Sequence, residues 1–332
     1  MSSTVAVAGG TGGVGRTIIE AILADGKFDI IILARKVKIT LSFDLIYVVG
    51  TETLCQYDEQ KEKRIGARII PVDYTNIEAL TKVLEENSVH TVISTMDIMS
   101  SAEPELNLIA AADKSAVTKR YVGNVWGVDY TDEFINNTPL FQAKHAATDA
   151  LDSTKLEHTV WYTGHFADYY LMPHAKSYLN MLTCVVDMAN NTAAIPGSGN
   201  VPVAFTYTQD LAKYVAASLT LPQWPSRTWL VGDKMTWNEV VAFAESAKRT
   251  KLNVTYDSLE TLRTGKVTAL PNYEAMRAFV PQEILEGILA QYGLLFEAGV
   301  FDLKPEHTVK DDFPEIKVKA FKELIAEAWG GK

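Results

Sequence analysis

A run of glycines directly after the first apolar segment constrains the fold of this chain more than any other feature. Residues 5–8 read Val-Ala-Val-Ala, residues 9–15 read Gly-Gly-Thr-Gly-Gly-Val-Gly, and an apolar helical pattern follows from Ile18. A β-carbon in such a turn strains the backbone or holds a pyrophosphate away, and the first N–H groups of the helix attract negative charge. A glycine-rich turn can be purely structural, but its place between a strand and a helix favours dinucleotide binding. We therefore predict that the cofactor contacts Gly9, Thr11, Gly12, Gly13, Val14 and Gly15.

The chain then alternates short apolar strands with amphipathic helices, which is typical of a parallel sheet covered by helices on both faces. Thr75 and Glu78 predict a capping box at the start of one helix. A later helix is expected to turn Leu106, Ile109 and Ala110 inward. The further strands are expected at residues 29–34, 67–72, 91–95, 120–125 and 159–162.

The composition changes after His165, and a second part of the chain is expected to begin there. Residues 168–190 predict a helix rich in tyrosine and methionine, and Thr236 with Glu239 predicts a capping box on a later helix. We expect a dinucleotide-binding domain at 1–165 and a smaller, mostly helical substrate or partner domain at 166–332. Segments such as 201–220 are expected to pack back onto the first domain.

Residues 37–56 interrupt the alternation of strands and helices. About twenty mostly apolar residues stand here between the second and third strands, where a short connection is usual. A flap over the adenine end of a cofactor and an additional hairpin are two interpretations. A third is that the segment is an unspliced intron, since its removal leaves an ordinary polar connection and its ends, Val37 and Gln56, fit the two ends of an intron.

Charge and cysteine content narrow the classes of partner. The net charge of −10 argues against binding nucleic acid or an acidic membrane surface. The two cysteines, Cys55 and Cys184, have no metal-type spacing and fit a reducing compartment. We therefore expect no metal site. The N-terminus leads directly into the first strand without a signal peptide, so we expect a cytoplasmic protein.

An ordered set of short motifs resembles the NmrA-like and isoflavone-reductase-like branch of the atypical short-chain dehydrogenases/reductases, over nearly the whole chain. The motifs are Gly9-Gly10-Thr11-Gly12-x-x-Gly15, Leu33-Ala34-Arg35, Val72-Asp73, Arg120-Tyr121-Val122, Lys144 in its helix, Thr163-Gly164-His165-Phe166 and Phe205-Thr206-x-x-x-Asp210. The resemblance implies a Rossmann-type domain with a smaller C-terminal substrate domain, and NADP(H) as the usual cofactor. Some members of this branch are reductases, and others resemble redox-sensing regulators.

The end of the second strand carries Arg35 and Lys36, where an NAD-binding protein places an acidic residue. A guanidinium pairs with the 2′-phosphate of NADP(H) in a fork geometry, whereas a solvated surface arginine is the alternative. Asp73 is expected beside the adenine or in a turn. Thr95 and Met96 end the fourth strand, where the family's backbone passes the cofactor.

The catalytic prediction rests mainly on Lys144, which matches a family lysine that approaches the nicotinamide ribose and assists proton transfer. The family's Pro-Ser-Glu-Phe-Gly stretch appears here as residues 123–127, Gly-Asn-Val-Trp-Gly, so its serine and glutamate are absent. Asn124 is a candidate donor to a substrate carbonyl. The candidate substrate-pocket residues, which also fit a packed core, are Tyr130, His165, Phe166 and Tyr169.

The sequence therefore predicts an NADPH-dependent reductase of a carbonyl or conjugated double bond in a small molecule of the quinone, enone or aldehyde class. The alternative is a non-catalytic NADP(H) sensor that acts on a regulatory protein, with the nucleus as a further location. Lys144 favours the enzyme, and the missing serine and glutamate favour the sensor.

Overall fold

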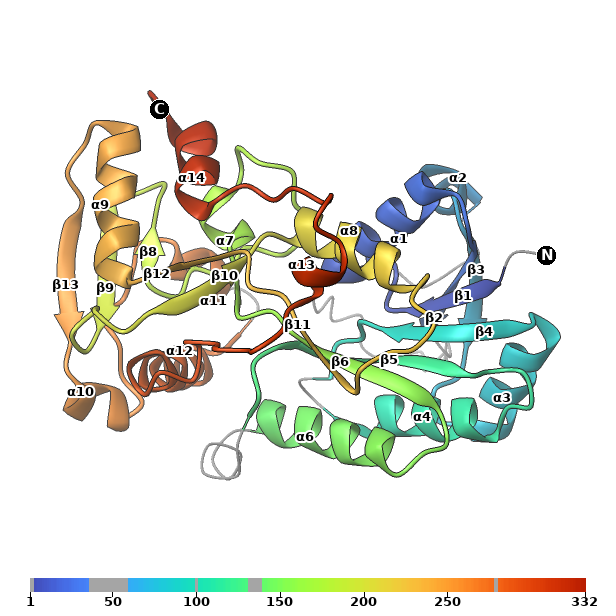
Figure 1. Ribbon diagram of the computed structural model, residues 1–332. Coiled ribbons are helices and arrows are strands. Elements are labelled where there is room, and N and C mark those ends of the chain that lie inside the picture. The colour runs from blue at the N-terminus through green and yellow to red at the C-terminus, as the bar shows by residue number, and fades with distance from the viewer. Residues whose placement is uncertain (1–2, 36–58, 99–100, 131–138, 278–279) are drawn as a thin grey trace. The chain divides into compact units, whose positions relative to one another are not determined.

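The computed structural model describes residues 3–35, 59–98, 101–130, 139–277 and 280–332 (Figure 1). Residues 37–56, the segment interpreted as a flap, a hairpin or an unspliced intron, lie outside these residues, as does Lys36. The chain forms two compact units, one of residues 1–125, 132–160 and 219–226, the other of residues 126–131, 161–218 and 227–332. The expectations of a boundary at residue 165 and of 201–220 packing on the first domain stay predictions.

The first part of the chain alternates strands with helices, as its periodicity predicts. In order, the elements are β1 (Thr4–Ala8), α1 (Gly13–Asp25), β2 (Asp29–Arg35), α2 (Glu59–Ile65), β3 (Arg68–Val72), α3 (Ile77–Glu86), β4 (Val89–Ser94), α4 (Glu103–Lys114), β5 (Arg120–Gly127), α6 (Pro139–Asp152) and β6 (Glu157–Tyr162). The strands are short and almost fully buried, so their apolar runs form the core between the helical layers.

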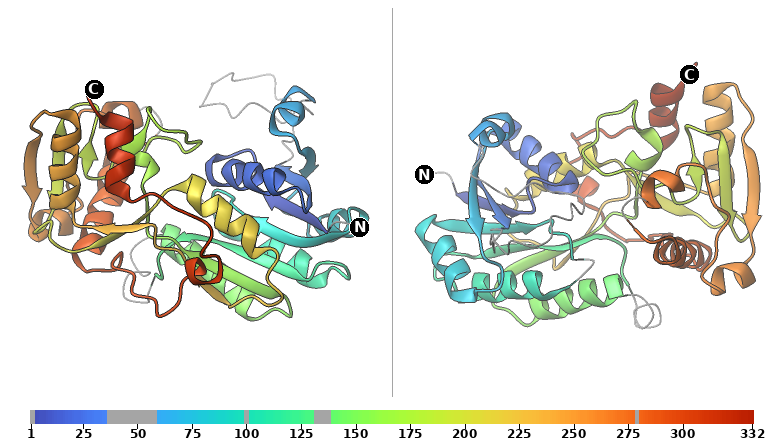
Figure 2. Two further views of the ribbon diagram at one scale, coloured as in Figure 1. Left: turned by 45° about the horizontal axis from the view of Figure 1, so that its top comes forward. Right: turned by 180° about the vertical axis from the view of Figure 1, so that it is seen from behind.

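The strand order of the large sheet is β11-β6-β5-β4-β1-β2-β3. β1 pairs in parallel with both β2 and β4, and the order reverses there. α3, α4 and α6 lie on one face of this sheet and α1 lies on the other (Figures 1 and 2). This is a Rossmann-like α/β fold, as predicted, and its switch point is the crevice where open parallel sheets bind ligands.

The second unit combines helices with two three-stranded sheets, of order β12-β10-β7 and β13-β9-β8. Its elements and the neighbouring strand β11 are β7 (His165–Phe166), α7 (Asp168–Leu171), β8 (Val186–Asp187), β9 (Thr192–Pro196), β10 (Val203–Thr206), α8 (Thr208–Ser218), β11 (Arg227–Trp229), β12 (Asp233–Met235), α9 (Trp237–Lys248), β13 (Asn253–Asp257), α10 (Leu259–Arg263), α11 (Tyr273–Arg277), α12 (Gln282–Glu297), α13 (Val309–Asp312) and α14 (Phe321–Trp329). The predicted capping box of Thr236 and Glu239 is confirmed at α9.

Three local predictions are wrong. The helix expected over 168–190 ends at Leu171, because Pro173 lacks an N–H group and disfavours helical backbone at Met172. α3 begins after Asn76, whose side chain accepts a hydrogen bond from the Ala79 N–H, so Asn76 rather than Thr75 caps the helix. On α4 the buried face carries Glu105, Leu108, Ile109, Ala111 and Ala112, while Ala110 is exposed.

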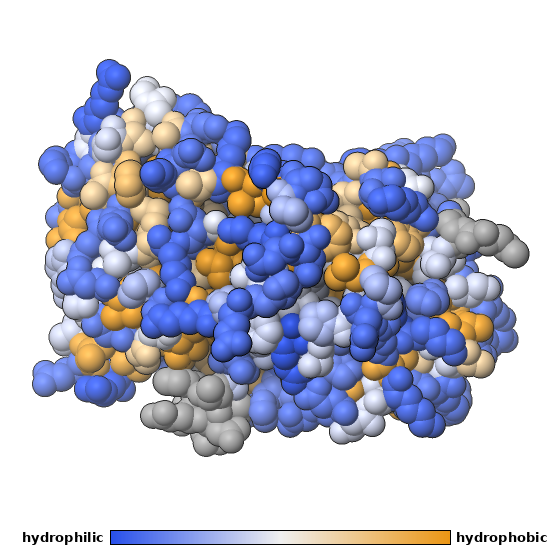
Figure 3. Space-filling model, in the orientation of Figure 1, coloured by the Kyte–Doolittle hydropathy of each residue, from blue (hydrophilic) through white to orange (hydrophobic). Residues whose placement is uncertain are grey.

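Exposed apolar residues are dispersed among polar ones on the face of the molecule in Figure 3. The large apolar side chains that are exposed are Leu23, Tyr178, Met181, Phe243, Tyr256 and Ile284. Within the described ranges, no helix is both long enough and apolar enough to cross a membrane.

Candidate functional site

The glycine turn connects β1 to α1 at the switch point of the sheet. Gly9 has a φ of +75°, a left-handed conformation that favours glycine, and its carbonyl accepts a hydrogen bond of 2.9 Å from the Gly12 N–H. α1 begins at Gly13 and, among the described residues, has neither a side-chain cap nor an acidic residue in its first turn. The N–H groups at the N-terminus of a helix are donors that commonly bind anions.

Gly9 and Gly15 are needed for close packing within the protein, whereas Gly12 is not. A β-carbon at Gly9 would lie 2.6 Å from the Thr95 carbonyl oxygen, and one at Gly15 would lie 2.4 Å from Thr95 Oγ1, so both glycines are required by the close approach of the segment after β4. A β-carbon at Gly12 would meet, among the described atoms, only the Gly9 carbonyl oxygen at 3.3 Å. Gly12 is exposed, and its contact with a pyrophosphate stays a prediction.

Arg35 is the exposed last residue of β2 and stands in register with Val72 of β3. Asp73 follows directly, and its Oδ1 accepts hydrogen bonds from the Thr75 N–H at 3.0 Å and the Thr75 hydroxyl at 2.7 Å. Asp73 therefore shapes a turn, and its contact with the adenine stays a prediction. Arg35 lies where a 2′-phosphate is expected, and its role stays a prediction.

Thr95, Met96 and Asn124 form a connected edge at the carboxyl ends of β4 and β5. The Thr95 N–H and hydroxyl both donate to the Ala8 carbonyl oxygen, at 2.9 and 2.8 Å. The amide nitrogen of Asn124 donates to the Met96 carbonyl oxygen at 2.7 Å, and the side chain is almost fully buried. Asn124 is thus engaged inside the protein, and its contact with a substrate stays a prediction.

Lys144 lies on α6, which begins at Pro139, so its place in a helix is confirmed. Its half-buried ammonium donates a hydrogen bond to the Val125 carbonyl oxygen, at the end of β5. Burial lowers the pKa of Lys144 to about 8. An amine with this pKa exchanges a proton readily near neutral pH, which suits a general acid.

The four candidate substrate-pocket residues lie together in the second unit, in an aromatic cluster. The ring of His165 lies 5.4 Å from that of Tyr169, and the ring of Tyr169 lies 6.3 Å from that of Phe166. Burial and then the neighbouring Tyr292 and Tyr169 raise the pKa of Tyr130. His165 is 4% exposed and pairs with the Tyr170 hydroxyl at 3.0 Å. Burial lowers the pKa of His165 to about 3, so its ring is uncharged at neutral pH.

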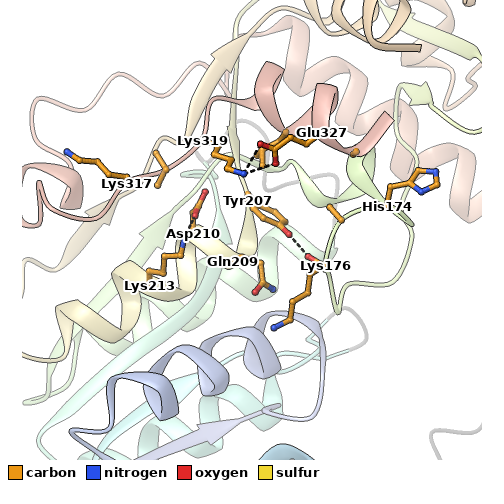
Figure 4. A pocket seen from close by; sticks show the side chains of 13 residues that line it. His174, Lys176, Tyr207, Gln209, Asp210, Lys213, Lys317, Lys319 and Glu327 are labelled. Carbon is orange, nitrogen blue, oxygen red and sulfur yellow. Dashed lines mark hydrogen bonds and ion pairs between the residues drawn. The ribbon is translucent and has the colours of Figure 1, made fainter. Parts of the chain in front are cut away.

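A cavity of about 590 Å³ also lies in the second unit (Figure 4). Its walls include Lys176, Lys213, Lys317 and Lys319, of which Lys213 pairs with Asp210 and Lys319 with Glu327. None of the four predicted pocket residues is among the described residues that line it. This lysine-lined cavity is therefore a feature separate from the aromatic cluster.

The sequence analysis missed Glu105, which is fully buried behind the ends of β4 and β5. Its carboxylate accepts hydrogen bonds from the hydroxyls of Ser94 and Tyr121. The sequence spacing could have predicted this burial. Glu105 precedes the apolar Leu108 and Ile109 by three and four residues, so it shares their inward face of the helix.

The parallel sheet, its switch point and the uncapped glycine turn define an α/β protein of the dinucleotide-binding class. The chain belongs to the NmrA-like family, whose model matches residues 1–323, and the resemblance inferred from the motifs is confirmed.

Relatives with assigned names support this membership. The chain is 31% identical to oxidoreductase BOA1 of Botryotinia fuckeliana (strain B05.10), over 90% of this chain and 89% of that protein. It is 26% identical to pinoresinol reductase 2 of Arabidopsis thaliana, over 76% and 77% of the two chains. A solved structure described as AtPrR2 with NADP+ and (+)pinoresinol has a TM-score of 0.70 and 21% identity and covers 98% of each chain, so it supports the fold.

Proposed function

We propose that this protein is an NADPH-dependent reductase of a carbonyl or conjugated double bond in a small organic molecule. The observation that carries the proposal is Lys144, whose half-buried amine, with a pKa of about 8, lies against the end of β5. The relatives named as an oxidoreductase and a pinoresinol reductase support the same class of reaction.

The first unit offers the groups that such a cofactor needs. The exposed Gly12, which lacks a side chain, and the N–H groups of α1 suit the pyrophosphate. Arg35 suits the 2′-phosphate that distinguishes NADP(H) from NAD(H), because a guanidinium binds phosphate with paired hydrogen bonds. The remaining predicted contacts are Thr11, Gly13, Val14, Lys36, Asp73, Thr95 and Met96.

The bound cofactor supplies a hydride, and the protein must supply a proton and an oriented substrate. In our proposal the Lys144 ammonium holds the nicotinamide ribose and donates the proton as charge develops on the substrate. Its lowered pKa makes it a stronger acid than an ordinary lysine. The Lys144–Val125 hydrogen bond holds the amine beside the end of β5.

The proposed substrates are quinones, enones and aldehydes. The predicted pocket residues Tyr130, His165, Phe166 and Tyr169 present aromatic surfaces and an uncharged imidazole. Such surroundings suit a flat and uncharged molecule better than an ionised one.

The test has two stages, which are NADPH binding by titration calorimetry and then NADPH oxidation with a panel of quinones, enones and aldehydes. We expect tight NADPH binding and turnover of at least one substrate. A protein that binds no NADPH would refute the proposal.

A non-catalytic NADP(H) sensor is the second candidate. It is favoured by Asn124, which replaces the family's serine and donates its amide proton to Met96 inside the protein. Tight NADPH binding without turnover of any panel member would support the sensor, and a protein partner captured only with one redox form of the cofactor would identify its target class.

A further inference from the structure

Glu105 is a fully buried acid that the proposed reaction does not use. It projects from α4 and accepts hydrogen bonds from Ser94 Oγ and, at 3.0 Å, from Tyr121 Oη. Ser94 is the last residue of β4 and Tyr121 lies on β5. One carboxyl group therefore joins a helix to the two neighbouring strands that lead to the candidate site.

The side-chain amide and the backbone N–H of Asn124, three residues after Tyr121 on β5, both lower the pKa of the same carboxyl group. Asn124 in turn holds the Met96 carbonyl oxygen at 2.7 Å. The next residue of β5, Val125, accepts the hydrogen bond from Lys144. Glu105 thus lies directly behind the backbone that carries both Asn124 and the partner of the proposed acid.

The pKa of the Glu105 carboxyl group lies near neutral pH. Burial raises its pKa to about 7, and the hydrogen bonds from Ser94, Tyr121 and Asn124 oppose that rise. The titratable groups that face it are Tyr121 from β5 and Tyr74 from the segment after β3. Burial raises the pKa of each, and the Glu105 charge raises it further. Arg35 acts on Tyr74 in the opposite direction.

The two forms of the carboxyl group require different hydrogen bonds. The ionised form only accepts, so its three neighbours can all donate to it. The protonated form must donate one hydrogen bond, and at least one neighbour has to reorient. A change of this kind is transmitted to Asn124 because Asn124 shares the network.

We propose, building on the reductase function, that Glu105 is a positioning residue that fixes Asn124 and, through it, the Met96 carbonyl at the edge where the nicotinamide is expected. This edge is expected to receive the nicotinamide because open parallel sheets bind their ligands outside the carboxyl ends of the strands. Glu105 itself touches neither cofactor nor substrate.

The first variant is Glu105→Gln, which keeps the shape but adds an amide donor among three groups that already donate. We expect its NADPH affinity to stay within about three-fold of the parent and its kcat to fall by about ten-fold or more, the size of one hydrogen bond to a charged group. The fluorescence of bound NADPH should follow an ionisation near pH 7 in the parent and not in this variant. Glu103→Gln, at an exposed position of the same helix, is the matched control.

Thermal unfolding without cofactor gives an independent measurement. The folded pKa of about 7 lies above the ordinary glutamate value of 4.5, so the stability from protonated Glu105 is fully present below about pH 4.5 and is lost as the pH rises from there to about 7. The melting temperature of the parent, relative to that of Glu105→Gln, should therefore fall over this interval.

Tyr121→Phe is the second variant, for the case that Glu105→Gln does not fold. It removes one donor to the ionised form, so the ionisation seen in NADPH fluorescence should move to higher pH. Unchanged kcat and an unchanged fluorescence profile in a folded Glu105→Gln protein would overturn the role of Glu105 alone, and an unmoved profile in Tyr121→Phe would do the same. A parent that binds no NADPH would instead overturn the proposed function and this inference with it.

Discussion

Replacing Lys144 by methionine separates catalysis from cofactor binding. Methionine keeps much of the length of the side chain and removes both the charge and the donor to Val125. A lysine with a pKa of about 8 is protonated in a ratio of about ten to one at pH 7, so the parent enzyme holds its acid in the active form there. Above pH 8 the parent should lose about ten-fold in kcat/KM per pH unit.

The expected losses differ in size. A general acid contributes about 10²–10⁴-fold in rate, whereas one polar contact to the ribose contributes about 0.5–1.5 kcal/mol in affinity. Lys144→Met should therefore bind NADPH within about ten-fold of the parent and lose at least about a hundred-fold in turnover. It should also lose the fall in rate above pH 8.

The assay is NADPH oxidation with the best panel substrate over a series of pH values, with calorimetry for NADPH affinity and thermal unfolding for integrity. Lys82→Met on α3, where the lysine side chain is 74% exposed, is the control for loss of a lysine. Equal turnover by the parent and a folded Lys144→Met protein would refute a catalytic role for Lys144.

Three further predictions concern the cofactor site and the inserted segment. Gly12→Ala should fold but bind NADPH weakly, because among the described atoms its β-carbon would meet only the Gly9 carbonyl oxygen, at 3.3 Å, on the side where the pyrophosphate is expected. Gly15→Ala should instead lose about 1–3 kcal/mol of stability through overlap with Thr95. Calorimetry and thermal unfolding distinguish the pair, and equal stability losses would contradict the assignment. Arg35→Ala should weaken NADPH by about ten-fold or more and NADH much less, because a charged contact to phosphate contributes about 1.5–3 kcal/mol. Equal losses in the two affinities would show that Arg35 does not bind the 2′-phosphate. Deletion of residues 37–56 should leave solubility and NADPH affinity unchanged, and an unfolded or non-binding product would rule out the intron interpretation.

The sequence by itself determined the features that depend on short stretches of chain. The glycine turn, the alternation that makes a parallel sheet, the helix of Lys144 and the capping box at Thr236 all follow from patterns within about a dozen residues. The same local reasoning failed over 168–190, where it gave more weight to the apolar composition than to Pro173. Local sequence patterns therefore predict which side chains lie on which helix or strand.

Only the tertiary structure decided which of these groups meet. Glu105, Ser94 and Tyr121 are separated by up to 27 positions, and their hydrogen bonds arise because parallel strands bring distant residues to one edge of the sheet. The sequence offered Asn124 as a donor to a substrate carbonyl, which stays a prediction, and only the structure shows that its amide nitrogen donates to the Met96 carbonyl oxygen. The lowered pKa values of Lys144 and His165 are likewise results of burial, which depends on everything packed around a residue and is not carried by its neighbours in sequence.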